Sequence, residues 1–376
     1  MKKILILFIV LMSFYACDKK QNDIVLLDVN AFTKVVDGKE VSLYTLDSGN
    51  GLTMQVTNFG ARVVSLWTPD KNGKYDDVVL GHTDINQYIA CDGERFIGCV
   101  VGRFANRIAN GKFVLDGVEY QVPINNNGQS LHGGLKGLDL VVWQVDTVTS
   151  NEIRFSYISP DGDDGYPGTL SINMVYSLTP DNEFKITYKA TTDKPTVVNL
   201  SHHTFFNLKG EGNGTINDHI LTINGSSIVP VDSVLIPTGE LMPVENTPFD
   251  FRNATTIGER IDAGHQQLKI GSGYDHNWVL DRKSEKGVEL AASVYEPVSG
   301  RLLEVWTDQP GMQFYGGNFF TGEGKGKYGK TQNYRESLAL ETQKFPDAPN
   351  QPNFPSTRLN PGEEYTQTCI YKFSTK

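Results

Sequence analysis

Five short segments of the chain gather side chains that could move protons or hold a ligand rich in hydroxyl groups. They are residues 102–108 (GRFANRI), 130–134 (SLHGG), 199–207 (NLSHHTFFN), 273–278 (GYDHNW) and 340–343 (LETQ). Imidazole and carboxylate groups accept and donate protons near neutral pH. Guanidinium and amide groups add directional donors that suit hydroxyls or carboxylates. The sequence therefore contains the parts of an acid–base site, although each segment alone is a weak signal.

His202 and His203 are neighbours in a stretch that has the composition of a strand. Side chains of adjacent strand residues point to opposite faces, so these two histidines cannot readily bind one metal ion, which argues against a zinc site. One of them could face a pocket, with Phe205 on the same side as His203. The alternative is a buried, hydrogen-bonded histidine in a core strand.

Glu341 follows the apolar residues 338–340, an unusual position for a carboxylate. Burial of a carboxylate is costly unless the group is paired or functional, so Glu341 is a candidate for chemistry. A glutamate at the exposed end of a strand is the alternative.

The other polar clusters also have structural alternatives. The two glycines after His132 allow a close approach of the backbone to a ligand, but a turn with an incidental histidine has the same sequence. Asn106 and Arg107 could bind a ligand, or the arginine could close a local ion pair. Residues 161–165 (DGDDG) faintly resemble a calcium loop but lack the distal glutamate of an EF-hand. A plain turn is favoured there, and calcium is expected at most in a structural role.

The segments that must position these groups read almost entirely as strands and turns. Apolar and polar residues alternate over 170–176 and 184–190, which predicts strands with one buried face. An Asp-Gly pair between two β-rich runs predicts a hairpin over residues 112–120.

This pattern predicts an all-β fold, a large antiparallel β-sandwich with few short helices. The 37 Gly and 17 Pro residues supply the dense turn signals that such a fold needs. Short helices are expected only at 83–90, with Thr83 or Asp84 as the cap, and at 258–261. A βαβ alternation and a phosphate-binding glycine motif are both missing from the sequence, which argues against a nucleotide-binding sheet.

Composition limits the partners. The net charge is −10 with no basic stripe, so nucleic acid is not an expected partner. The four cysteines, Cys17, Cys91, Cys99 and Cys369, include no C-x-x-C pair. Cys91 and Cys99 could pair in an oxidising compartment, but buried free thiols are the favoured interpretation.

The first residues have the composition of an export signal. A basic start is followed by the apolar residues 4–12, and the small residue Ala16 precedes Cys17. The apolar stretch is too short for a membrane-spanning helix, which needs about 20 residues. An alanine directly before a cysteine resembles the lipobox of bacterial lipoproteins, in which the cysteine is acylated and becomes the mature N-terminus.

We therefore expect a signal peptide over 1–16, a lipid-anchored tether over 17–30 and a single domain over 31–376. The protein would be an exported cell-envelope lipoprotein, on the periplasmic side or at the cell surface, with the bacterial membrane as a partner through Cys17. An ordinary cleaved signal with a chance cysteine is the alternative. A monomer is the default expectation.

The five polar segments keep the order and content of one family: they resemble the signature segments of aldose 1-epimerases. Four further segments resemble that family as well, namely residues 229–240 (VPVDSVLIPTGE), 312–318 (MQFYGGN), 346–352 (PDAPNQP) and 359–365 (LNPGEEY). The resemblance covers roughly residues 35–374.

The resemblance implies an antiparallel β-sandwich with an open cleft that binds free aldose sugars. Its members interconvert the α and β anomers of hexoses such as glucose and galactose, without a metal or other cofactor. Carried over by motif, Glu341 would be the general base and His203 the general acid. The residues implied to bind the sugar are Asn106, Arg107, His132, Phe205, Asp275 and Gln313.

Two positions depart from the family pattern. His202 stands where asparagine is usual, and Phe205 stands where tyrosine is frequent, which puts the preferred sugar in doubt. Three other functions stay open: a sugar-binding lipoprotein without activity, a glycoside hydrolase with Asp275 and Glu341 as paired carboxylates, and an epimerase of phosphorylated hexoses. The presence of both Glu341 and His203 counts against the first.

Overall fold

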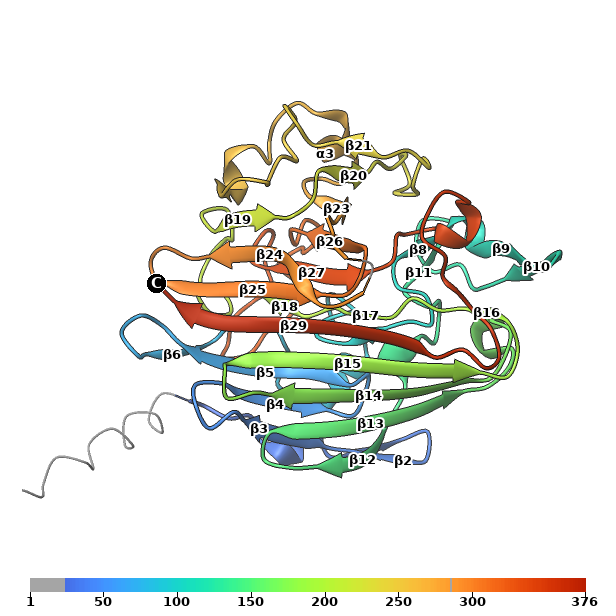
Figure 1. Ribbon diagram of the computed structural model, residues 1–376. Coiled ribbons are helices and arrows are strands. Elements are labelled where there is room, and N and C mark those ends of the chain that lie inside the picture. Colours follow the sequence, from blue (N-terminus) through green and yellow to red (C-terminus); the bar gives the residue numbers. More distant parts are fainter. Residues whose placement is uncertain (1–23, 285) are drawn as a thin grey trace, which may run out of the picture.

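The computed structural model describes residues 24–284 and 286–376, whose regular secondary structure consists mostly of antiparallel strands (Figure 1). The expected signal peptide and Cys17 lie outside the described residues. The Leu27 N–H donates to Gln55 Oε1 at 2.8 Å, and Asp28 caps the 3₁₀ helix η1 (Val29–Phe32). The fold therefore begins within the segment that was expected to be tether. No described helix is long and apolar enough to cross a membrane.

A nine-stranded antiparallel sheet forms the largest layer. Its order is β12-β13-β14-β15-β29-β25-β24-β19-β22. The strands are β12 (Gln144–Val148), β13 (Glu152–Ser159), β14 (Leu170–Leu178), β15 (Glu183–Thr192), β29 (Tyr365–Thr375), β25 (Arg301–Thr307), β24 (Glu289–Tyr295), β19 (Ile220–Ile223) and β22 (Thr255–Thr256). The two strands predicted by alternation are β14 and β15, and their apolar residues are the buried ones, as predicted.

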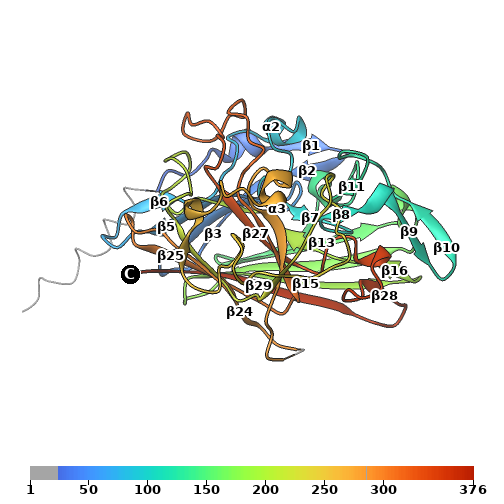
Figure 2. The same cartoon turned by 90° about the horizontal axis from the view of Figure 1, so that it is seen from above.

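Two smaller sheets pack against this layer (Figures 1 and 2). The six-stranded sheet contains β18 (Phe205–Phe206), β27 (Leu338–Gln343), β26 (Gly311–Tyr315), β23 (Asp275–Val279), β20 (Ser227–Val229) and β21 (Met242–Pro243). The four-stranded sheet contains β3 (Leu43–Asp47), β4 (Thr53–Thr57), β5 (Arg62–Pro69) and β6 (Tyr75–Asp77). One continuous apolar cluster draws buried residues from all three sheets, which is how a sandwich buries its inner faces. The predicted all-β sandwich is confirmed.

Five two-stranded ladders complete the β structure. They are β1 (Lys34–Val36) with β2 (Lys39–Val41), β7 (Val100–Val101) with β17 (Ser201–His202), β8 (Arg107–Ile108) with β11 (Ser130–Leu131), β9 (Lys112–Leu115) with β10 (Val118–Gln121), and β16 (Thr196–Val197) with β28 (Arg358–Leu359). The β9–β10 ladder is the predicted hairpin around Asp116-Gly117.

Helices are few and short. α2 (Ile85–Ile89) is confirmed with Asp84 as its cap, but the second expected helix is only a 3₁₀ turn, η5 (Ile257–Glu259). The other 3₁₀ turns are η2 (Ala109–Gly111), η3 (Leu138–Leu140), η4 (Asp163–Gly165) and η6 (Ala348–Asn350). α3 (Gln266–Ile270) was not predicted, because its cap is His265, whose ring accepts the Gln267 N–H, and histidine is not among the usual cap residues.

Cys91, Cys99 and Cys369 are free thiols. The interpretation of Cys91 and Cys99 as unpaired is therefore confirmed, although Cys91 is only half-buried.

Candidate active site

One face of the six-stranded sheet forms the floor of a pocket. Glu341 of β27 pairs with Gln313 of β26, which pairs with Asn277 of β23, and cross-strand partners share a face. Asp275 and Tyr315 lie two residues along their strands and share the same face. The alternate residues of these strands point into the main core. A strand whose one face is core and whose other face is polar thus carries Glu341 to the centre of the site.

His203 reaches the pocket from a different ladder. Its N–H donates to the Cys99 carbonyl oxygen at 2.8 Å, which continues the pairing of β17 with β7. His202 points the other way, and its ring packs 5.4 Å from that of Tyr176 in the core. The two adjacent histidines therefore face opposite sides, as predicted.

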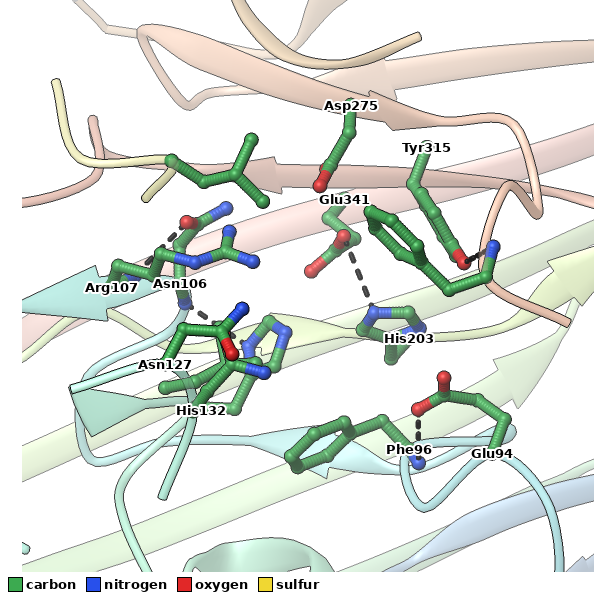
Figure 3. Close-up of a pocket in the computed structure, with 14 residues that line it drawn as sticks. Glu94, Phe96, Asn106, Arg107, Asn127, His132, His203, Asp275, Tyr315 and Glu341 are labelled. Atoms are coloured by element: carbon green, nitrogen blue, oxygen red, sulfur yellow. Dashed lines mark hydrogen bonds and ion pairs between the residues drawn. The ribbon is translucent and has the colours of Figure 1, made fainter. Parts of the chain in front are cut away.

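Glu341 and His203 face each other inside the pocket (Figure 3). Glu341 Oε1 lies 3.4 Å from His203 Nε2, and the two side chains are 2% and 6% exposed. Among the described residues, Glu341 Oε2 and His203 Nδ1 have no hydrogen-bond partner. Such buried, unpartnered atoms are expected where a substrate completes the site.

Burial keeps a single proton on this pair. Burial lowers the pKa of His203 to about 3. Burial also raises the pKa of Glu341 well above its usual range; the Asp275 carboxylate adds to that rise, and Arg107 opposes it. Near neutral pH the pair therefore carries one titratable proton, because His203 resists protonation and the Glu341 carboxyl group resists ionisation. One group of the pair can then act as an acid while the other acts as a base.

These directions predict an unusual pH profile for turnover. The acid limb of kcat/KM, where His203 gains the second proton, should lie below the ordinary imidazole value of about 6.5. The alkaline limb, where the pair loses its only proton, should lie above the ordinary carboxyl range. We therefore expect kcat/KM for an aldose to show no loss as the pH falls through about 6.5, the ordinary imidazole value. Polarimetric rates that fall on the acid side of about pH 6.5 would contradict this assignment.

His132, Asn106 and Arg107 form the opposite wall. The Asn106 N–H donates to His132 Nδ1 at 3.0 Å, and the Arg107 N–H donates to Asn106 Oδ1 at 2.9 Å. Burial lowers the pKa of His132 well below its usual value, so the ring is neutral. Because Nδ1 accepts a hydrogen bond, the proton of the neutral ring is on Nε2. His132 is thus held as a donor.

The cavity has a volume of about 320 Å³, small for a ligand site and suited to a single sugar ring. Fourteen residues line it, namely Glu94, Phe96, Asn106, Arg107, Asn126, Asn127, Leu131, His132, His203, Leu235, Asp275, Tyr315, Phe319 and Glu341. The Phe96 ring packs 4.6 Å from His132, which supplies an apolar wall beside the polar groups.

A comparison with known protein families identifies the family of this chain. The model of the family described as aldose 1-epimerase matches residues 42–372. The chain belongs to the aldose 1-epimerase family.

Relatives in this family cover nearly the whole chain. Galactose mutarotase from Rattus norvegicus is 44% identical over 323 residues, which are 86% of this chain and 91% of the relative. Aldose 1-epimerase from Escherichia coli (strain K12) is 37% identical over 342 residues, which are 90% of this chain and 96% of the relative. The solved structure of an aldose epimerase homologue from C. elegans has a TM-score of 0.82 and 32% identity, and covers 89% of this chain and 99% of that chain.

Six of the eight predicted site residues of this aldose 1-epimerase family member line one pocket. They are Asn106, Arg107, His132, His203, Asp275 and Glu341. Gln313 does not line it; its Nε2 donates to Asp275 Oδ1 at 2.7 Å and so orients that carboxylate from behind. Phe205 is fully buried, with its ring 4.8 Å from that of His203. Neither side chain is among the residues that line the cavity, and their contact with a sugar stays a prediction.

Several residues that line the cavity were not predicted from the sequence. Tyr315 lies two residues after the predicted site residue Gln313 on β26 and therefore shares its face, so its position in the segment 312–318 was a readable signal. Glu94 and Phe96 lie on a loop with no repeating pattern, and only the fold brings that loop to the pocket.

One group of potential metal ligands occurs among the described residues, and it lies within the pocket. His132, His203 and Glu341 offer ligand atoms within 4.8 Å of one another. His202 and His203 face opposite sides, but the fold brings the ring of His132 to 5.1 Å from that of His203, which the sequence did not predict. However, Nδ1 of His132 already accepts a hydrogen bond and Nε2 carries its proton, so this ring has no free lone pair for a metal.

Residues 161–165 form a turn whose carboxylates are already occupied. Asp161 pairs with Lys194, Asp163 Oδ2 accepts the Ser159 hydroxyl at 2.6 Å, and Asp164 Oδ2 accepts the Lys136 N–H at 2.9 Å. The favoured turn is confirmed. The structural calcium ion stays a prediction.

The glycines after His132 lie close to other parts of the chain. Gly133 has φ +97°, and a Cβ there would lie 1.8 Å from the Gly102 carbonyl oxygen. The close approach that Gly133 permits is therefore to the Gly102 backbone, and an approach to a ligand stays a prediction. Its role is to let the His132 loop pack against the 102–108 segment.

Gly133→Ala should therefore unfold at clearly lower urea concentration than the wild type. Both the positive φ and the backbone clash oppose a methyl group, and we expect a loss of more than about 2 kcal/mol in the free energy of unfolding. Gly128→Ala is the matched control, since Gly128 has φ +81° but open space around it. Equal losses for the two variants would show that packing against Gly102 contributes nothing.

Proposed function

We propose that the protein is an aldose 1-epimerase (mutarotase) that interconverts the α and β anomers of free hexoses and needs no cofactor. The observation that carries this proposal is the Glu341–His203 pair, 3.4 Å apart in a cavity of about 320 Å³. Membership of the aldose 1-epimerase family supports it.

The chemistry requires one proton acceptor and one proton donor. The sugar ring opens when the C1 hydroxyl loses a proton and the ring oxygen gains one. The step starts from the form of the pair in which the shared proton is on His203: the Glu341 carboxylate accepts the first proton and His203 donates the second. The C1–C2 bond rotates, the ring closes on the other face, and both groups exchange roles, so that the enzyme returns to its starting state.

The other pocket residues hold the sugar and balance charge. The Nε2–H of His132 and the guanidinium of Arg107 can stabilise negative charge that develops on oxygen during ring opening. Asn106 and Asp275 bind hydroxyl groups. Gln313 positions Asp275 through the 2.7 Å hydrogen bond, and Phe205 supports the ring of His203.

The substrate is a free hexose, galactose or glucose. The names of the mammalian relatives, which are galactose mutarotases at 43–45% identity, support galactose as the first sugar to test. The export signal expected at the N-terminus fits free sugars outside the cytoplasm better than phosphorylated ones.

We also propose that the protein is an exported, lipid-anchored monomer. The sequence before Cys17 supports acylation of that cysteine and a cell-envelope location. Palmitate labelling of the full chain tests this proposal, with Cys17→Ser as the control that should lose both the label and the membrane association.

Polarimetry tests the proposed reaction. Residues 18–376 are added to freshly dissolved α-D-galactose or α-D-glucose, and the approach to equilibrium rotation is followed. We expect acceleration over buffer, with the ratio of the two rates giving the preferred sugar. If neither sugar responds but both bind in calorimetry, the protein is a sugar-binding protein without activity.

A further inference from the structure

Glu94 is a lining residue of the pocket that the proposed reaction does not use. It lies on the loop between α2 and β7, and Figure 3 labels it on the opposite side of His203 from Glu341. Among the described residues its carboxylate accepts one hydrogen bond, from the Phe96 N–H to Oε1 at 3.1 Å. A carboxylate has about four acceptor positions, so most of its capacity is left for a ligand.

Within residues 24–284 and 286–376, the Glu94 carboxylate has no ion-pair partner, although two arginines lie close by. The Arg95 guanidinium binds the Asp139 carboxylate through two hydrogen bonds, from Nε at 2.7 Å and from Nη2 at 2.9 Å. Arg62 donates to the carbonyl oxygens of Arg95 and Ile97. Both guanidinium groups therefore make structural contacts behind the pocket, and the Glu94 carboxylate faces the cavity without them.

The pocket as a whole is short of positive charge. Because the Glu341–His203 pair holds one proton, its net charge is zero. Glu94 and Asp275 then face the cavity against one lining cation, Arg107. Burial raises the pKa of Glu94, with the Asp275 carboxylate acting in the same direction, while Arg62 and Arg95 oppose the rise. The negative charge of Asp275 therefore repels that of Glu94 across the cavity.

We propose that Glu94 is a specificity-determining residue that accepts hydrogen bonds from neutral aldoses and excludes aldoses with an anionic group, such as uronic acids and sugar phosphates. This inference rests on the proposed mutarotase function. In a small, largely buried cavity, an added negative charge interacts with Glu94 through a low effective dielectric, and water cannot screen it fully. A hydroxyl donor, by contrast, gains a charge-assisted hydrogen bond.

The test compares galactose with galacturonate, which has the same ring and carries a carboxylate in place of the C6 hydroxymethyl group. Anomer exchange is measured at pH 7.5 for the wild type and for Glu94→Gln, which keeps an oxygen for the Phe96 N–H. We expect the ratio of kcat/KM for galacturonate to that for galactose to rise about tenfold in E94Q, mainly through KM. Galactosamine, which carries an ammonium group when protonated, should respond in the opposite direction.

Glu119→Gln is the matched control, because its carboxylate is 60% exposed on β10 and pairs with Lys112. It makes the same charge change outside the pocket and should leave both ratios unchanged. If E94Q is poorly folded by circular dichroism, Glu94→Asn makes the same charge change with a shorter side chain.

The outcomes separate the two proposals. A wild type that does not accelerate galactose exchange overturns the proposed function itself. A wild type that turns over galactose, with ratios unaltered by E94Q, overturns the role of Glu94. A change in the same direction for galacturonate and galactosamine also overturns it, since that result indicates a structural effect and not a charge effect.

Discussion

Replacement of Glu341 by glutamine should lower kcat for anomer exchange by about 10²–10⁴-fold while sugar affinity changes little. Glutamine keeps the size and hydrogen-bonding capacity of the side chain but cannot accept the proton of the C1 hydroxyl. Glu341 is buried, and its Oε2 has no partner within the described residues, so the amide fits without loss of an existing hydrogen bond there. Polarimetry gives kcat, and calorimetric titration with galactose gives the dissociation constant.

The control for this variant is Glu364→Gln, since Glu364 is 49% exposed and pairs with Lys189 at the surface. It should keep full activity. If E341Q turned over galactose at a rate near that of the wild type, Glu341 would not be the base. If it lost binding together with turnover, its role would be to hold the sugar.

Replacement of Lys327 by methionine should lower the free energy of unfolding by about 3–5 kcal/mol. Lys327 is fully buried, with its Nζ 2.7 Å from Asp77 Oδ2 and 3.4 Å from Glu211 Oε2. Methionine fills the space but leaves two buried carboxylates without their cation, which costs more than the loss of the pair itself. Urea titration followed by circular dichroism measures the change.

The effect of Lys327→Met should extend to the active site. Lys327 lies in the long connection between β26 and β27, which also carries the lining residue Phe319, and it fastens that connection to β6 through Asp77. Lys189→Met is the control, because Lys189 and Glu364 form an exposed pair at 3.0 Å and such pairs contribute about 0–1 kcal/mol. Equal losses in the free energy of unfolding for the two variants would mean that the buried Lys327 ion pairs stabilise the fold no more than the exposed Lys189 pair does.

Local patterns were sufficient for the elements whose side chains alternate strictly. β14 and β15 were predicted because one face is core and the other is solvent, and the Asp116-Gly117 hairpin was predicted because its turn chemistry is local. α3 was missed because five residues with a histidine cap have too little periodicity to be recognised. Strand order was not predictable, since neighbours such as β15 and β29 are far apart in the sequence.

In the site too, some features were predictable from local sequence and others depended on long-range packing. Glu341 and His203 could be named from their segments, but their 3.4 Å contact depends on the packing of β27 against the ladder that continues from β17. Phe205 lies in the same segment as His203, and Gln313 lies in the segment 312–318, yet neither side chain lines the cavity. Motif membership thus identified the neighbourhood of the site, and only the packing distinguished residues that reach the cavity from those that support it.

The most direct test of the account is a double-variant cycle on the proton-transfer pair. Rates of α-D-galactose exchange are measured for the wild type, Glu341→Gln, His203→Asn and the double variant. Because the two groups act as one proton relay, either single change should already remove the acid–base contribution, and the double variant should be about as slow as the slower single one. Losses that multiply would mean that the two residues act independently, and near-full activity in either single variant would contradict the mechanism.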